Sequence, residues 1–285
     1  MPLLKRRDGT EIHWAERGFA DGPLVLLAAP FFGYPEVFEG LLSNLATDHR
    51  VVTYDIRGTG SSSREGPYDL ATDAADLEAL LDEEGPARVT IGAGDGLNRV
   101  VKVASRRPDL VDAVLSPGGN PIGRRAATGG SDALAGSESV LEALVGMMTT
   151  DYRAALRTMV AGANPQMDED AARERVSRVV TYCPQEAAAP RLRDWIADEP
   201  LEDARALGDR LWVLDAGGSD WFPEDLAARA RVLLPNAHVE SMEDGAISRP
   251  DLTAAIIRGI TSVPRTPLEG TGAGEGARRR RIHEG

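Results

Sequence analysis

The sequence predicts an α/β fold in which a mostly parallel central sheet is flanked by helices. Short apolar runs of strand length alternate with longer segments of helical period along residues 1–119 and again along 206–262. A glycine-rich turn, Gly92-Ala93-Gly94-Asp95-Gly96, joins one such strand to one such helix. Regular alternation of this kind is typical of βαβ units, whose strands run parallel.

The core elements follow one another in a regular order. The expected strands cover residues 10–17, 23–29, 50–54, 87–91, 111–115, 210–214 and 238–242. The expected helices cover residues 35–47, 70–84, 97–107, 223–234 and 249–260. In the second of these helices, Ala74, Leu77 and Leu81 share one face, as an amphipathic helix on a sheet requires.

A turn rich in proline and glycine, at residues 116–121, interrupts this alternation. Four segments of helical period follow it, at residues 138–148, 151–160, 168–181 and 189–197. We expect them to form a helical cap, residues 120–205, over the carboxyl edge of the sheet, with the core divided into 1–119 and 206–262. The tail, residues 263–285, is rich in Pro, Gly and Glu, and we expect it to be disordered. We assign no function to its run Arg278–Arg281, which an acidic chain would present as a solvated segment.

Composition limits the partners of the chain. Its 285 residues carry a formal net charge of −13, which argues against nonspecific nucleic acid binding and against attraction to anionic membranes. The single cysteine, Cys183, excludes an internal disulfide and a cysteine-rich metal site, and we predict no metal and no cofactor. No apolar run approaches the ~20 residues that span a bilayer. Because the first residues become charged before a signal-peptide core could form, we expect a cytoplasmic protein.

The glycine-rich turn is arranged like a nucleophile elbow without a nucleophile. In such an elbow the central residue sits on a strained turn above the sheet, and small residues flank it so that strand and helix can approach. Gly92 and Gly96 supply the flanks, and Gly94 stands at the centre. The alternative is an ordinary βα turn, which is also rich in glycine for steric reasons.

Three further segments carry a family resemblance. They are Pro23–Gly33, Val51–Ser62 with its Asp-x-Arg-Gly-x-Gly-x-Ser turn, and Arg106–Val111. Together with the elbow, they resemble α/β-hydrolase fold proteins over about residues 9–260. The resemblance implies the α/β-hydrolase fold with an inserted helical cap, and a framework that in the family carries a Ser-His-Asp triad.

The resemblance also assigns the triad positions. Gly94 stands where the family has its nucleophile, and Asp220, in Gly217-Gly218-Ser219-Asp220, stands where it has its acid. Ala246 takes the place of the histidine. Since a hydroxyl attacks an ester only after a base removes its proton, we expect a degenerate triad with no covalent intermediate through residue 94.

Other residues near the predicted carboxyl edge suggest different chemistry. Asp95 and Asp220 are candidate catalytic carboxylates, because burial in a capped pocket raises a carboxyl pKa toward the range of proton transfer. One oxyanion-hole donor is expected at the Asp95 backbone N–H and another in the turn 29–32. The remaining candidates for the pocket or oxyanion region are Phe31, Phe32, Ser116, Trp221, Glu243 and Asp244. The structural alternative is that Asp95 caps its helix and Asp220 satisfies turn amides.

Three functions remain open from the sequence. The first is a nonhydrolytic enzyme of the cyclase, lyase or isomerase type, in secondary metabolism, acting on a small molecule in a capped pocket. The second is a noncatalytic pseudo-hydrolase that binds a small ligand or a protein partner. The third is a hydrolase with Asp95 as nucleophile, as in the related haloalkane dehalogenases and epoxide hydrolases, although the spacing places Gly94 at that position.

Overall fold

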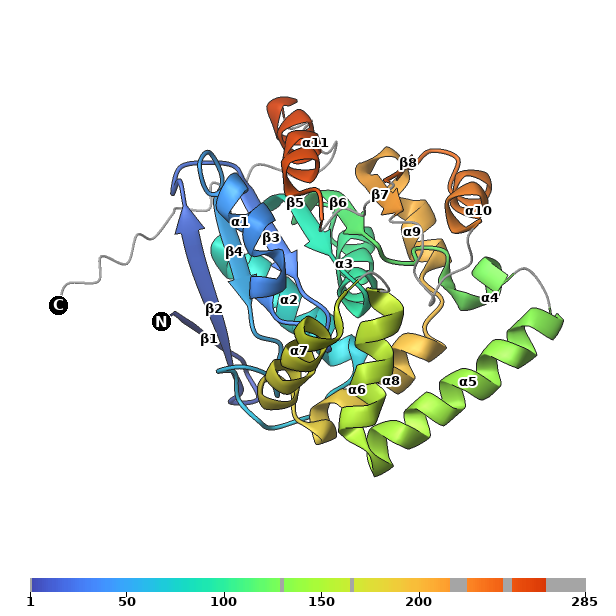
Figure 1. Ribbon diagram of the computed structural model, residues 1–285. Helices are drawn as coiled ribbons and strands as arrows, with labels where there is room; N and C mark the ends of the chain where they lie inside the picture. Colours follow the sequence, from blue (N-terminus) through green and yellow to red (C-terminus); the bar gives the residue numbers. More distant parts are fainter. Residues whose placement is uncertain (1, 129–130, 165–166, 216–224, 243–247, 265–285) are drawn as a thin grey trace.

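A single eight-stranded sheet organises the structure, a computed structural model that describes residues 2–128, 131–164, 167–215, 225–242 and 248–264 (Figure 1). The strands are β1 (Leu3–Lys5), β2 (Glu11–Gly18), β3 (Leu24–Ala28), β4 (Arg50–Tyr54), β5 (Ala87–Gly92), β6 (Val111–Pro117), β7 (Leu211–Asp215) and β8 (His238–Ser241). Their spatial order is β1-β2-β4-β3-β5-β6-β7-β8. The β1/β2 and β2/β4 pairs are antiparallel and the other pairs are parallel, which confirms the predicted mostly parallel sheet.

Helices cover both faces of this sheet. The core helices are α1 (Glu39–Leu45), α2 (Leu70–Glu84), α3 (Asp95–Arg106), α10 (Leu226–Leu233) and α11 (Pro250–Ser262). The apolar residues of α1 and α11 share one buried cluster with the strands, and those of α2, α3 and α10 belong to the cluster on the other side. All five residues of β3 are buried, as expected for a central strand of a parallel sheet covered on both faces.

The insertion between β6 and β7 is helical, as predicted. It contains α4 (Gly123–Thr128), α5 (Ser131–Thr150), α6 (Tyr152–Ala163), α7 (Glu169–Tyr182), α8 (Gln185–Ala197) and α9 (Leu201–Leu207), followed by the 3₁₀ turn η2 (Gly208–Arg210). In Figure 1, α5 to α8 lie together beside one end of the sheet. Contacts from α7 and α8 to the loops after β4 and β3 place these two helices over the carboxyl ends of the strands. The boundaries of core and cap, 1–119, 120–205 and 206–262, stay predictions.

Local sequence signals explain the boundaries of two core elements. The observed bounds of β4 and α2 coincide with the predicted ones, and the Asp69 side chain caps α2 by accepting a hydrogen bond from the Thr72 N–H at 2.7 Å. The predicted helix 35–47 is wrong in one respect: its first turn, Pro35–Phe38, is the 3₁₀ turn η1, and α1 begins at Glu39. The predicted disordered tail lies outside the described residues from residue 265 onward.

The described residues contain neither a membrane-spanning helix nor a cluster of metal-binding side chains. None of the helices there is long and apolar enough to cross a membrane. Within the same residues, His, Cys, Asp and Glu side chains form no group of three or more that could hold a metal ion.

Candidate functional site

The turn between β5 and α3 has the geometry of an elbow. Gly94 adopts φ +54° and ψ −128°, a left-handed conformation that side chains with a Cβ rarely adopt. Its neighbours must also be small, since a Cβ at Gly96 would lie 2.1 Å from the Ala28 carbonyl oxygen and one at Gly92 would lie 2.6 Å from the Leu97 Cα. These close approaches bring strand and helix together as the sequence predicts for an elbow centred on residue 94.

The space above Gly94 is narrow. A Cβ built on Gly94 would lie 3.1 Å from the Cβ of Pro30 and 3.2 Å from the Cζ of Phe32. Contacts this short require the neighbours to shift by a few tenths of an ångström. The Phe32 ring therefore lies beside the position that a side chain at residue 94 would occupy.

Asp95, the first residue of α3, is a buried partner of the loop after β3. Its Oδ1 accepts a hydrogen bond from the Phe31 backbone N–H at 2.9 Å, and its Oδ2 pairs with Arg99 one helical turn later. Arg99 in turn donates to the Ala29 carbonyl oxygen. The Asp95 residue is only 4% exposed, and burial raises the pKa of its carboxyl against the lowering effects of Arg99 and of the Phe31 N–H.

The other candidates in the described residues have apolar or structural surroundings. Phe31 is fully buried and meets the half-buried Phe32 ring edge-on, with ring centroids 5.3 Å apart. Phe32 also contacts Trp195 of α8, at 5.8 Å between ring centroids. Ser116 is fully buried at the end of β6, where its hydroxyl accepts a hydrogen bond from the Gly119 N–H at 3.1 Å. Ser116 thus closes a turn.

A second buried ion pair lies next to Asp95. Arg191 of α8 donates two hydrogen bonds to the Asp73 carboxylate of α2, at 2.6 and 2.7 Å. A third bond from Arg191 reaches the Arg57 carbonyl oxygen at 2.7 Å. Both residues of the pair are almost fully buried, so a charged contact shielded from bulk solvent fixes the cap helix to the core.

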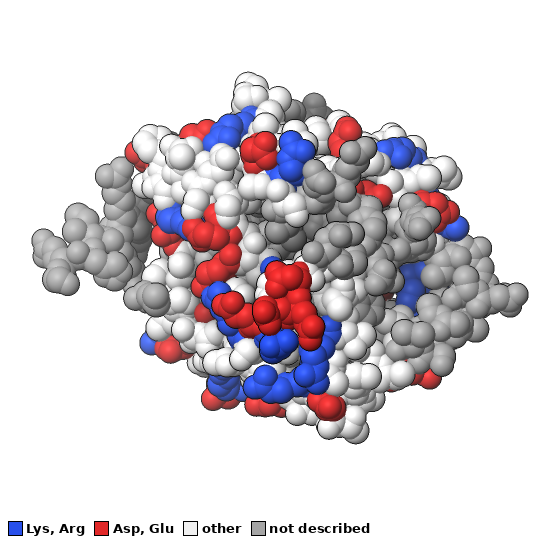
Figure 2. Space-filling view, in the orientation of Figure 1, with Lys and Arg blue, Asp and Glu red and all other residues white. Residues whose placement is uncertain are grey.

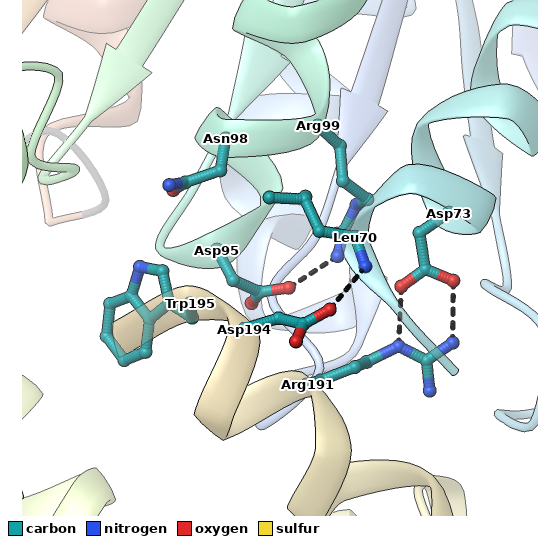
Figure 3. A pocket seen from close by; sticks show the side chains of 8 residues that line it. All are labelled: Leu70, Asp73, Asp95, Asn98, Arg99, Arg191, Asp194 and Trp195. Carbon is teal, nitrogen blue, oxygen red and sulfur yellow. Dashed lines mark hydrogen bonds and ion pairs between the residues drawn. The ribbon is translucent and has the colours of Figure 1, made fainter. Parts of the chain in front are cut away.

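The two ion pairs line one small cavity (Figure 3). Its volume is about 10 Å³, which is room for a single water molecule. The lining residues are Leu70, Asp73, Asp95, Asn98, Arg99, Arg191, Asp194 and Trp195. Figure 3 shows the Asp95–Arg99 and Asp73–Arg191 pairs side by side between α3, α2 and α8. A space this small holds water and no organic substrate.

Five sequence-predicted site residues lie outside the described residues. They are Asp220, Trp221, Glu243, Asp244 and Ala246. Asp220 stays the predicted acid of the triad and Ala246 the residue at the predicted histidine position. Trp221 stays a predicted pocket residue, and Glu243 and Asp244 stay predicted carboxylates of the pocket.

Four residues around this cavity are not among those predicted from the sequence: Arg99, Arg191, Asp73 and Trp195. The Asp95–Arg99 pair has a local signal, since an acid and a base four residues apart lie on the same side of a helix. The Asp73–Arg191 pair joins residues 118 positions apart, so no local sequence pattern predicts it.

Comparison with known proteins identifies the family to which this geometry belongs. The sequence matches the model of the alpha/beta hydrolase family over residues 24–256. The chain belongs to the alpha/beta hydrolase family. Solved structures agree with the fold of this α/β-hydrolase: a bromoperoxidase from Bacillus anthracis superposes with a TM-score of 0.79 at 18% identity, covering 92% of this chain and 99% of the other. An esterase from Exiguobacterium antarcticum superposes with a TM-score of 0.76 at 14% identity, with 92% and 99% covered.

Curated relatives match only part of the α/β-hydrolase chain. "Probable oxidoreductase EphD" of Mycobacterium tuberculosis is 35% identical over 118 residues, which are 40% of this chain and 20% of EphD. The chain thus spans a fifth of the length of this relative. This identity over a short segment is consistent with membership of the family. It does not transfer the activity of EphD to this chain.

Proposed function

We propose that this α/β-hydrolase is nonhydrolytic and binds a small molecule, releasing it unchanged. The observation that carries the proposal is the elbow itself: Gly94, with no side chain, occupies its centre in the strained conformation. Glycine offers no atom that could attack a carbonyl carbon, so the covalent route of the family has no starting point at this residue.

The loop after β3 supports the same conclusion. An oxyanion hole works by pointing free N–H groups at the place where negative charge develops. The Phe31 N–H, a donor of the turn in which one is expected, instead donates to the Asp95 carboxylate at 2.9 Å. An oxyanion approaching this N–H would meet the negative charge of Asp95 in a buried setting, where the repulsion is weakly screened.

The contacts of Asp95 favour a structural role over a catalytic one. A carboxylate that moves a proton or attacks a substrate must reach it, whereas both Asp95 oxygens are engaged, by Phe31 and by Arg99, and the residue is 4% exposed. This favours the noncatalytic interpretation over both a nonhydrolytic enzyme that uses Asp95 and a hydrolase that uses it as nucleophile.

A nonhydrolytic enzyme remains the second candidate because of one observation. Burial raises the pKa of Asp95, and carboxyl groups with raised pKa values are frequent in sites of proton transfer. In that case Asp220 would be the other carboxylate of the site. Similar proteins are named as an oxidoreductase, a bromoperoxidase and an esterase, so the same fold accommodates different chemistries. The function of this chain must therefore be inferred from its site and not from its fold.

Activity measurements test this proposal. The purified protein is incubated with a panel of esters, lactones and amides, and separately with a fluorophosphonate probe, with an active serine esterase of the same fold as positive control. We expect no hydrolysis above the rate in buffer and no mass increase of the protein. Stoichiometric labelling of a serine, or turnover that survives repurification, would refute the proposal. Turnover lost in Asp220→Asn would instead favour the second candidate.

A further inference from the structure

Cap helix α7 presents three long side chains to one tyrosine of the core. Arg175, Arg178 and Tyr182 are spaced by three and four residues, so they share a side of the helix. The guanidinium carbon of Arg178 lies 4.1 Å from the centroid of the Tyr34 ring, and the Tyr182 ring meets the same ring edge-on at 6.3 Å. Tyr34 is buried and follows Phe32 by two residues, so this group of side chains adjoins the loop that faces Gly94.

Arg175 is half-buried without an opposite charge. Its Nη1 donates to the Asn164 side-chain oxygen at 3.1 Å. Burial lowers the pKa of Arg175, and the neighbouring Tyr34 hydroxyl only partly offsets this effect. Among the residues that the structure describes, neither Arg175 nor Arg178 has a carboxylate oxygen within 4.0 Å, although Arg173 on the same helix pairs with two carboxylates, at 3.3 and 3.1 Å.

Three arginines that are buried more deeply than Arg175 each pair with a carboxylate. Arg57 pairs with Asp76 at 2.7 Å, Arg191 pairs with Asp73 at 2.6 Å, and the third is Arg99 with Asp95. Withdrawing a guanidinium from water costs free energy unless an opposite charge compensates for it. A ligand with a negative charge would recover this free energy at Arg175.

We propose that Arg175 and Arg178, on the outer side of the cap, bind the anionic group, a carboxylate or a phosphate, of the small molecule that the protein binds. This inference rests on the proposed function and gives the chemical class of its ligand. A guanidinium offers paired N–H donors that match the oxygens of either group. The Tyr34 ring holds the Arg178 guanidinium in place by a cation–π contact. Because this side chain is already ordered, it loses less conformational entropy when a ligand binds.

The surface around these residues carries both charges. Figure 2 shows a group of acidic side chains beside a group of basic ones on the face over α6 and α7. The acidic residues at the start of α7, Glu169 and Asp170, are bound to Arg173.

Binding of simple anions tests the proposal. Sodium hexanoate and inorganic phosphate are titrated into the full-length protein by calorimetry and by thermal shift, at constant ionic strength set with chloride. 1-Hexanol serves as the neutral analogue of hexanoate. The test variant is Arg175→Gln/Arg178→Gln, and the control is Arg153→Gln/Arg157→Gln, which removes the same charge from exposed positions of α6.

We expect the wild type and the control to bind at least one of the two anions, and the test variant to bind it about tenfold more weakly. Preference for hexanoate would identify a carboxylate ligand, and preference for phosphate a phosphorylated one. Binding of neither anion by the wild type, equal binding by the test variant, or an equal loss in the control would overturn the proposal. If the double variant does not fold, Arg178→Gln alone, at an exposed position, decides in the same way.

The outcome is separable from that of the proposed function. Retention of an unchanged ligand from a cell extract, together with no effect of the two arginines on its binding, would refute the anion site and leave the proposed function intact. Chemical conversion of a bound ligand would refute the proposed function, whatever the arginines do.

Discussion

The Asp95 carboxylate accepts a hydrogen bond from the Phe31 backbone N–H at 2.9 Å. This contact joins the start of α3 to the loop after β3, the two segments that would have to supply an oxyanion hole. Because the same carboxylate pairs with Arg99, which donates to the Ala29 carbonyl oxygen, both ends of the loop's first turn are fixed to α3. The Asp95 carboxylate therefore holds the elbow region together and occupies the N–H of Phe31, in the turn where the sequence predicts an oxyanion-hole donor.

Replacing Asp95 with asparagine should destabilise the protein strongly. The change leaves Arg99 buried without its opposite charge, and breaking one partner of a buried pair costs ~3–5 kcal/mol. Urea unfolding monitored by circular dichroism measures this loss. Glu169→Gln, which breaks the exposed pair with Arg173, is the control and should cost no more than ~0.5 kcal/mol. Equal effects of the two changes would contradict the structural role of Asp95.

Restoring a serine at the elbow should not create an esterase. Gly94→Ser places a Cβ in a left-handed backbone conformation and against Pro30 and Phe32, at a cost of ~1–3 kcal/mol. Gly94→Ala is the matched control, since it adds the same Cβ without a hydroxyl. Both variants should melt at a lower temperature than the wild type, by similar amounts, and neither should hydrolyse p-nitrophenyl esters. Ester turnover by Gly94→Ser alone would show that a base and an oxyanion hole are still in place.

The Asp73–Arg191 pair should couple the cap to the core. Arg191→Met leaves the Asp73 carboxylate buried and unpaired, so we expect a loss of ~3–5 kcal/mol. The double variant Asp73→Leu/Arg191→Met removes both charges and should recover much of that loss. A double-mutant cycle gives the coupling, and hydrogen exchange should increase in α8 before it increases in β5. Additive effects of the two single changes would mean that the pair does not fix the cap.

Acid should remove the contribution of Asp48 to stability. Asp48 binds Arg258 of α11, at 2.6 Å, and this contact, with the neighbouring His49, lowers its pKa from 3.8 to about 2. A carboxyl with a lowered folded-state pKa stabilises the fold above its unfolded pKa and loses that effect as the pH falls toward the folded value. Because the side chain is 46% exposed, screening limits the effect to ~0.2–1 kcal/mol.

The measurement for Asp48 is a comparison of unfolding free energies across pH. Asp48→Asn should be less stable than the wild type near pH 6, and the difference should shrink between about pH 4 and pH 2. Asp21→Asn, at an exposed position, is the control for the loss of one carboxylate. A difference for Asp48→Asn that persists unchanged at pH 2 would refute the ion-pair explanation.

Local signals in the sequence predict the alternation of strands and helices, and the resemblance of three segments to α/β-hydrolases adds the particular fold. The sequence patterns predict β4 and α2 with their observed bounds. A buried strand and a capped amphipathic helix each have a pattern confined to neighbouring residues. β1, with three residues, and α4, with six, were missed since such short elements contain too few residues for a periodicity. The flanking glycines of the elbow were predictable because their cause, close approach of strand and helix, is also local.

The candidate site was harder to predict from the sequence. Asp95 was a catalytic candidate by its position after the elbow centre, and its contact with Phe31 spans 64 residues of sequence, which no local pattern encodes. Two further contacts join a core loop to cap helices through tertiary packing alone. The Phe32 ring contacts Trp195, and the Arg178 guanidinium lies over the Tyr34 ring. These contacts depend on how the cap lies on the sheet, and that is decided by the whole chain.

The central claim is that the protein binds a small molecule and leaves it unchanged, and native mass spectrometry tests it most directly. The purified protein is incubated with an extract of the cells that produce it, its noncovalent complex is isolated, and the released ligand is compared with the same compound in untreated extract. We predict a complex whose ligand carries a carboxylate or phosphate and is recovered with its mass unchanged. A covalent adduct on the protein, or a ligand recovered only as a new product, would contradict the account.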